Sequence, residues 1–169
     1  MTSFNLRSLK LRSGEQYQDE QEIQLSPLEF GGQRYLPVPE TVPAELRVTG
    51  ASTGTVFELD FNVRLHGPCQ RCLADAVLDR RIRGREYHAS SRDADEELRS
   101  PYIADDRLDL SAWARDAIAL DLPEQILHDP DCAGLCPVCG KDLNVEPHEH
   151  EEQQSDPRWE ALAELREKL

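Results

Sequence analysis

The chain has 169 residues, which is enough for one domain with a buried core and too few for two large domains. Its 33 Asp and Glu residues outnumber its 19 Lys and Arg residues, and the formal net charge is -14. Because this charge repels a phosphate backbone at long range, the composition excludes a broad nucleic-acid-binding surface and leaves room only for a local one.

Three strands are predicted in the first half of the chain. Residues 44–50 read as a strand that ends in a turn. In residues 55–65 ("TVFELDFNVRL") apolar and polar side chains alternate, which is typical of a strand with one buried face. Residues 76–88 alternate in the same way and would pair antiparallel with the preceding strand. The stretch "HGPCQRCLAD" then forms the tip of a long hairpin.

A helix is predicted in "DLSAWARDAIALDLPEQ", after a polar, acidic segment over residues 89–107 that we expect to be a mobile insertion. Asp109 or Ser111 can cap its start, and Pro123 marks its end. The residues at helical spacing, which should lie on the sheet, are Leu110, Trp113, Ala114, Ala117 and Ile118.

In the last part of the chain the sequence predicts an acidic linker over residues 146–155 and an amphipathic helix over residues 156–169. That helix either docks on its own domain or inserts into a groove of a partner. Residues 1–145 would form one α+β domain: an antiparallel sheet of about five to seven strands with one or two packed helices and a Cys-rich zinc knuckle.

The sequence predicts a cytoplasmic protein without a membrane partner. No stretch approaches the roughly 20 apolar residues that cross a bilayer, and the first residues lack the apolar run of a secretion signal. In that compartment five cysteines, an odd number arranged around two C-x-x-C pairs, favour metal binding or reactive thiols over a disulfide framework.

A C-x-x-C pair forms a tight turn, here called a knuckle, in which both sulfurs converge on one ion and backbone amides point at the sulfurs. In "CPVCG", Pro137 sets the backbone angle and Gly140 permits the positive φ that closes the turn. Two knuckles supply four thiolates for one structural Zn²⁺ site. The predicted ligands are Cys69, Cys72, Cys136 and Cys139.

Two alternatives to this ligand set remain open. The first needs no long-range meeting and combines Cys132, Cys136 and Cys139 with His148 or His150. In the second, the chain binds no metal. Cys132 is then a spare thiol, and the two histidines belong to a solvated acidic tail.

The thiols also permit a function of a different class, that of a thiol redox or metal-handling protein. Thioredoxin-like chemistry requires the first cysteine of the pair at a helix N-terminus. Cys69 instead falls in a predicted hairpin tip, and no helical pattern follows "CPVCG". The chain lacks a nucleophile elbow, a phosphate-binding glycine loop and an H-E-x-x-H motif. We therefore expect no enzymatic activity and no small-molecule substrate.

A local basic strip lies within this acidic chain, because residues 64–85 contain six arginines and two acidic residues. The candidate RNA contacts are Arg71, Arg81, Arg83 and Arg85. Alternation places the last three on one face of a strand, about 6–7 Å apart, which is comparable to successive RNA phosphates. The alternative is that they pair with Glu58 and Asp60 on the neighbouring strand.

Together these motifs resemble the YceD family, also called large ribosomal RNA subunit accumulation proteins. The resemblance rests on "CQRCL", "DLSAWARDAIALDLP", "CAGLCPVCGKDLN" and "DPRWEALAEL", in this order. It implies a non-enzymatic protein of ribosome biogenesis, in bacteria and plastids, that is needed for normal levels of large-subunit rRNA. Many relatives have a C-x-C pair or a His run where this chain has "HEH", which adds weight to a ligand from that segment.

The partners implied by the resemblance are ribosomal RNA or a large-subunit assembly intermediate. The acidic loops and tail would suit a basic ribosomal protein as a further partner.

Overall fold

The computed structural model describes residues 2–91 and 93–150. It divides the chain into two compact units, Met1–Cys132 and Ala133–Leu169. The boundary between the units falls inside the cysteine-rich segment. The single domain expected over residues 1–145 stays a prediction. The predicted helix over residues 156–169 lies outside the described residues.

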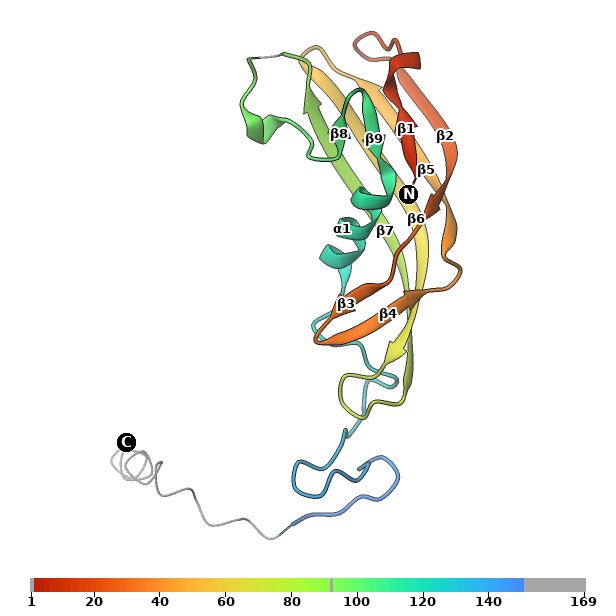
Figure 1. Ribbon diagram of the computed structural model, residues 1–169, viewed down its shortest axis with the longest axis vertical. Coiled ribbons are helices and arrows are strands. Elements are labelled where there is room, and N and C mark those ends of the chain that lie inside the picture. Colours follow the sequence, from red (N-terminus) through yellow and green to blue (C-terminus); the bar gives the residue numbers. More distant parts are fainter. Residues whose placement is uncertain (1, 92, 151–169) are drawn as a thin grey trace, which may run out of the picture. The chain divides into compact units, whose positions relative to one another are not determined.

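The first unit is mainly β-structure with one α-helix (Figure 1). Its strands are β1 (Ser3–Asn5), β2 (Gln16–Gln24), β3 (Leu28–Phe30), β4 (Gln33–Pro37), β5 (Thr41–Gly50), β6 (Gly54–Pro68), β7 (Asp75–Ala89), β8 (Ile103–Ala104) and β9 (Arg107–Asp109). Its helices are α1 (Leu110–Asp121) and the 3-10 turns η1 (Leu6–Ser8) and η2 (Glu96–Leu98). No helix in the described part of the chain has the length and apolar character that a membrane crossing requires.

Strand β6 is the centre of a six-stranded antiparallel sheet. One of its edges pairs with β7 along its whole length, from Gly54 opposite Ala89 to Pro68 opposite Asp75. The other edge is shared by β5 and β4, which pair with different parts of β6. Strands β2 and β3 extend the sheet beyond β5 and β4. The α+β class and the antiparallel sheet agree with the prediction.

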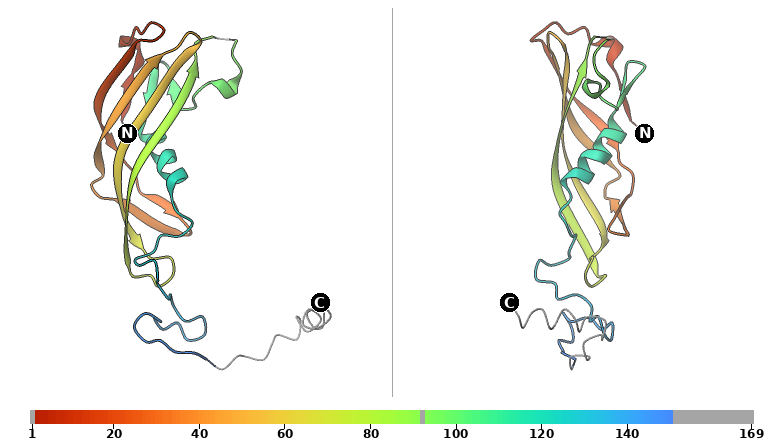
Figure 2. Two further views of the ribbon diagram at one scale, coloured as in Figure 1. Left: turned by 180° about the vertical axis from the view of Figure 1, so that it is seen from behind. Right: turned by 90° about the vertical axis from the view of Figure 1, so that its left-hand side faces the viewer.

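The alternation seen in the sequence produces a two-faced sheet. Phe57, Leu59 and Phe61 of β6 are at most 2% exposed, while the intervening Glu58 and Asp60 point to the opposite face. Helix α1 covers the apolar face, whereas the polar face, seen in the left view of Figure 2, carries no helix among the described elements. The polar face is therefore the open side of the sheet.

Helix α1 begins and packs as its sequence predicts. The Asp109 carboxylate accepts a hydrogen bond from the Ala112 amide at 3.0 Å, which caps the first turn. Trp113 and Ile118 are buried against the sheet. Gly84 of β7 leaves room for the Trp113 ring, because a Cβ at position 84 would lie 3.0 Å from the indole Nε1.

The acidic segment over residues 89–107 contains short regular elements. Besides the turn η2, β8 and β9 form a small three-stranded sheet with β1. Ser100 is 4% exposed, and its amide donates to His88 Nδ1 at 3.3 Å. Part of the segment is thus packed within the first unit. The predicted mobility of the segment stays a prediction.

Candidate metal-binding sites

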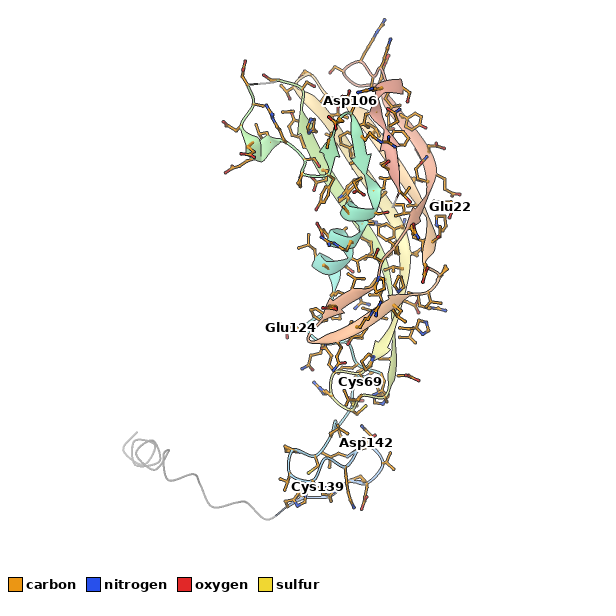
Figure 3. All side chains as sticks on the ribbon, in the orientation of Figure 1. Glu22, Cys69, Asp106, Glu124, Cys139 and Asp142 are labelled. Atoms are coloured by element: carbon orange, nitrogen blue, oxygen red, sulfur yellow. The ribbon has the colours of Figure 1, made fainter. Side chains whose placement is uncertain are left out.

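The first knuckle is the turn that joins β6 to β7, at whose start Cys69 lies (Figure 3). The Cys69 amide donates to the Ala74 carbonyl at 2.7 Å, and the Leu73 amide donates to the Cys69 carbonyl at 3.0 Å. Leu73 has a φ of 66°, which lets the chain reverse at this point. The two bonds hold Cys69 and Cys72 on the same turn.

The segment after α1 returns to this turn through hydrogen bonds with its backbone and side chains. The Gln70 amide donates to the Ile126 carbonyl at 2.9 Å, and the Ile126 amide donates back to Gln70 Oε1 at 3.3 Å. Arg71 donates through Nε to Gln125 Oε1 and through Nη1 to the Cys132 carbonyl, both at 3.0 Å. These contacts bring residues 125–132 beside the knuckle.

Four ligand atoms converge as a result. They belong to Cys69, Cys72, His128 and Cys132, and all lie within 4.8 Å of one another. The Cys72 sulfur is 3.3 Å from His128 Nδ1, and the Cys69 sulfur is 3.8 Å from the Cys132 sulfur. The three cysteines are buried, whereas His128 is exposed. Three thiols and one imidazole form a ligand set typical of structural zinc.

The turn also creates a thiolate next to a neutral thiol. Burial raises the Cys69 pKa, but hydrogen bonds from the His128 ring and from the Cys72, Arg71 and His128 amides outweigh it and lower the pKa to about 5. Burial together with the neighbouring Cys132 and Cys69 sulfurs raises the Cys72 pKa to about 11. One negative sulfur is therefore favoured before any cation binds, and a cation would favour the others.

The second unit contains a second group of four ligand atoms, from Cys136, Cys139, His148 and His150, again within 4.8 Å of one another. The Cys139 sulfur, labelled in Figure 3, is 3.1 Å from His148 Nε2. His148 Nδ1 is 2.7 Å from the Glu146 carbonyl, which can only accept, so Nδ1 carries a proton. This bond orients the ring with Nε2 toward the sulfur.

The electrostatics of the second group follow the same pattern. Hydrogen bonds from the Cys139 amide, followed by the Val138 amide and the Cys139 and His148 side chains, lower the Cys136 pKa to about 6 despite burial. The Glu146 carbonyl and the Cys136 sulfur raise the His148 pKa. Gly140 has a φ of 73°, so the positive φ predicted at this position is confirmed.

The structure thus combines the predicted ligands differently from either set that the sequence suggested. Cys69 and Cys72 are grouped with His128 and Cys132, and Cys136 and Cys139 are grouped with His148 and His150. Cys132, expected to be a spare thiol or a ligand beside Cys136, belongs to the first group.

Sequence reasoning missed His128 altogether. His128 lies four residues before Cys132, a spacing common among zinc ligands. This spacing is the signal that could have indicated His128 as a ligand. Both groups have the composition to hold a metal ion.

The predicted RNA contacts fall into two classes. Arg71 is engaged by the Gln125 side chain and the Cys132 carbonyl, as described above. Arg81 and Arg83 point to the open face of the sheet, where both pair with Asp60: Arg81 through two hydrogen bonds of 2.8 Å and Arg83 at 3.3 Å. The Arg81 hydrogen bond lowers the Asp60 pKa. Arg85 lies opposite Glu58 in the register of β6 and β7.

These internal pairs leave the arginines accessible to solvent. The side chains of Arg81 and Arg83 are 60% and 70% exposed. Both the predicted pairing with Asp60 and a solvent-facing basic strip on β7 are therefore present.

The fold and the two Cys/His groups define an α+β protein with the ligand sets of structural metal sites. The chain belongs to the YceD family: its residues 57–166 match the family described as large ribosomal RNA subunit accumulation protein YceD. The match includes most of the long hairpin, α1 and both cysteine groups. No solved structure gives a significant match.

The relatives come from mycobacteria and from Bacillus. An uncharacterized protein of Mycobacterium tuberculosis (strain H37Rv) is 36% identical over 132 residues, which cover 72% of this chain and 60% of the relative. An uncharacterized protein of Mycobacterium leprae is 29% identical, covering 85% and 64%. The uncharacterized protein YlbN of Bacillus subtilis is 28% identical, covering 71% and 73%. The chain thus spans about 60% of the length of the first of these relatives.

Proposed function

We propose that the protein is a cytoplasmic, non-enzymatic factor that supports the synthesis, processing or accumulation of large-subunit ribosomal RNA. The observation that carries this proposal is the family match over residues 57–166. The fold supports a binding role, since the long sheet has one face packed under α1 and one face open to a partner (Figure 2). The partner would be ribosomal RNA or a large-subunit assembly intermediate.

The ligand geometry supports a structural role for the cysteines of the first group over the alternative of thiol redox chemistry. A redox-active cysteine needs an accessible sulfur, often at a helix N-terminus. Cys69 is 0% exposed, and it lies in the turn between β6 and β7. Four protein ligands would also leave Zn²⁺ without an open position for water or substrate.

We assign the structural Zn²⁺ to Cys69, Cys72, His128 and Cys132. The ion would link the hairpin tip to the segment after α1, two parts of the first unit that the Arg71 and Gln70 hydrogen bonds already bring together. Metal binding would add several kcal/mol to the stability of this end of the sheet. Arg71 would then act as part of this scaffold, and its contact with RNA stays a prediction.

The RNA contacts would come from Arg81, Arg83 and Arg85 on β7. Their side chains repeat every second residue on the open face, at the spacing of about 6–7 Å that suits neighbouring phosphates. Asp60 is shared by two of these arginines, and surface ion pairs are weak, so a phosphate can compete for the guanidinium groups.

Sedimentation of a cell lysate that contains the full chain tests the proposed function. We expect part of the protein to sediment with precursors of the large ribosomal subunit. If the protein occurs only in the free fraction, at low as well as at moderate salt, the proposed function is wrong.

A pair of variants tests the surface. The double variant Arg83→Gln, Arg85→Gln should lose the association, because two phosphate contacts disappear while Asp60 keeps Arg81 as its partner. The matched control is Arg115→Gln on α1, whose guanidinium pairs with Asp116; it should sediment as the unchanged protein does. An unchanged association of the double variant contradicts the arginine surface and leaves the family role standing.

A further inference from the structure

The described part of the second unit, residues 133–150, has almost no hydrophobic core. Only Gly134 and Cys136 are buried, and Val138 and Val145 are 56% and 81% exposed. Its regular backbone pairing is a single bridge between Leu135 and Asp142. Ordering each residue costs about 1–2 kcal/mol of conformational entropy, which apolar burial of this extent does not offset. A defined fold in this segment needs another source of stability.

The backbone around Cys136 repeats that of the first knuckle bond for bond. The Cys136 amide donates to the Lys141 carbonyl and the Gly140 amide donates to the Cys136 carbonyl, both at 2.8 Å. At the hairpin tip the Cys69 amide donates five residues ahead, and its carbonyl accepts from four residues ahead, in the same way. The residue four places after the first cysteine has a positive φ in both turns. Two segments with unrelated neighbours therefore hold a C-x-x-C pair in one geometry.

The two histidines complete the second group in a manner suited to metal ligation. Metal-binding histidines usually donate their second ring N–H to a carboxylate, a backbone carbonyl or a water molecule, which fixes the ring. His148 does this through Nδ1 and the Glu146 carbonyl, and its Nε2 faces the Cys139 sulfur. The ring centroids of His150 and His148 are 4.9 Å apart, edge to face. Among the hydrogen bonds described above, only the contact between His148 and Cys139 links residues 148–150 to the second knuckle.

We propose that Cys136, Cys139, His148 and His150 bind a second zinc ion, and that residues 133–150 adopt their fold only with this ion bound. The chain then carries two ions with different tasks. The first ion adds stability to a sheet that has its own hydrophobic core. The second ion supplies the stability that a hydrophobic core would otherwise give to residues 133–150. Because Cys139 and His150 are exposed, a chelator removes the second ion before the first. The inference stands independently of the proposed role in rRNA accumulation.

Metal counting on the purified full chain tests the stoichiometry. We expect two zinc ions per chain in the unchanged protein and one in the double variant Cys139→Ser, His148→Ala. The matched control is His66→Ala, which removes a histidine of β6 outside both groups and should retain two. One ion in the unchanged protein, or two in the double variant, overturns the proposal.

Hydrogen exchange read by mass spectrometry tests the coupling between ion and fold. Stepwise addition of a chelator should first abolish amide protection in residues 133–150, while β6 keeps its protection. The double variant should show the same local loss without chelator, and the retained protection of β6 shows that the first unit is still folded. If residues 133–150 keep their protection after all metal has been removed, the metal-dependent fold is excluded.

Discussion

The two knuckles form the same turn with different residues at its most strained position. The residue four places after the first cysteine has a φ of 66° at Leu73 and 73° at Gly140. Glycine adopts this region without steric cost, whereas a residue with a Cβ loses roughly 1–2 kcal/mol there. Leu73 is 56% exposed, so its side chain recovers little of that cost through burial. The hairpin tip therefore holds a local strain that the second knuckle avoids.

Replacing this leucine should stabilise the protein. For Leu73→Gly we expect the free energy of unfolding to rise by about 0.5–1 kcal/mol, because relief of the left-handed conformation exceeds the entropy that glycine adds to the unfolded chain. Chemical denaturation of the zinc-loaded protein measures it. The control is Leu98→Gly, an exposed leucine without a positive φ, which should be neutral or destabilising. Equal destabilisation by both changes contradicts the strain.

Asp60 gives the open face a pH dependence of known sign. Its pKa is lowered in the folded state, first by the Arg81 hydrogen bond, so the ionised carboxylate stabilises the fold above the ordinary pKa of 3.8. This contribution is lost as the pH falls through the lowered folded-state pKa. We expect Asp60→Asn to cost about 0.5–1 kcal/mol at pH 7, as exposed ion pairs do, and nothing once the carboxyl of the unchanged protein is protonated.

Urea denaturation of both proteins at several pH values, with chelator present throughout, measures this difference without a contribution from bound metal. In the Arg81→Gln background the cost of Asp60→Asn at pH 7 should become smaller. A cost that is the same at every pH would assign the effect to something other than the carboxylate charge.

At the scale of elements, Trp113 is the largest buried side chain of α1, and its ring lies against β7. Trp113 is 2% exposed, and its ring lies over Gly84, where any side chain would crowd it. Leu120 lies two turns further along the helix, at nearly the same angle around its axis, and is 89% exposed. The two residues differ in burial and not in the side of the helix, so their truncation should have very different effects on stability.

We expect Trp113→Ala to lower the free energy of unfolding by about 3–5 kcal/mol, the usual range for a buried aromatic side chain. Leu120→Ala, on the same helix, should change it by less than about 0.5 kcal/mol, since the side chain is already in water and both residues favour helix. Thermal and chemical denaturation measure both. A small effect of Trp113→Ala would mean that α1 is not held on β7 through this ring.

The elements that the sequence predicts are those with one buried and one exposed face. In strands β5, β6 and β7 the apolar residues recur every 2 residues, and in helix α1 every 3.6 residues. The sequence therefore predicts both the type of each element and its buried side. Strand β2 (Gln16–Gln24) is different: it lies at the edge of the sheet, and Ile23 is its one buried residue. Its polar sequence shows no such period, and β2 forms a strand because it pairs with β5.

The site was predictable in its parts but not in its assembly. The local sequence determines each knuckle, including the positive φ at Gly140. Which ligands join a knuckle depends on the return of the chain after α1, and this return is set by contacts such as that between Arg71 and the Cys132 carbonyl, 61 residues apart. His128 lies in that returning segment, four residues before Cys132, and this spacing does not show which knuckle the two residues join. Spacing alone therefore could not assign it.

At the scale of the whole molecule, the charge is divided between a strongly acidic chain and one basic strip. The net charge of -14 opposes the approach of RNA, and charges farther from the RNA than the screening length, about 10 Å at 0.1 M salt, contribute little. Arg81, Arg83 and Arg85 act only within that distance. The proposed RNA contact should therefore be weak, restricted to β7 and dependent on few ion pairs.

The salt dependence of RNA binding tests this division. For single-stranded RNA, the logarithm of the association constant falls with the logarithm of salt concentration with a slope of about −0.7 per phosphate contact. Three contacts predict a slope of about −2, and Arg83→Gln, Arg85→Gln should reduce it to about −0.7. Titration of a fluorescent single-stranded fragment of large-subunit rRNA measures both slopes, with Arg115→Gln as the control. A slope that the double variant leaves unchanged would place the contacts outside β7, because the loss of two cations must release fewer counterions wherever those cations meet phosphates.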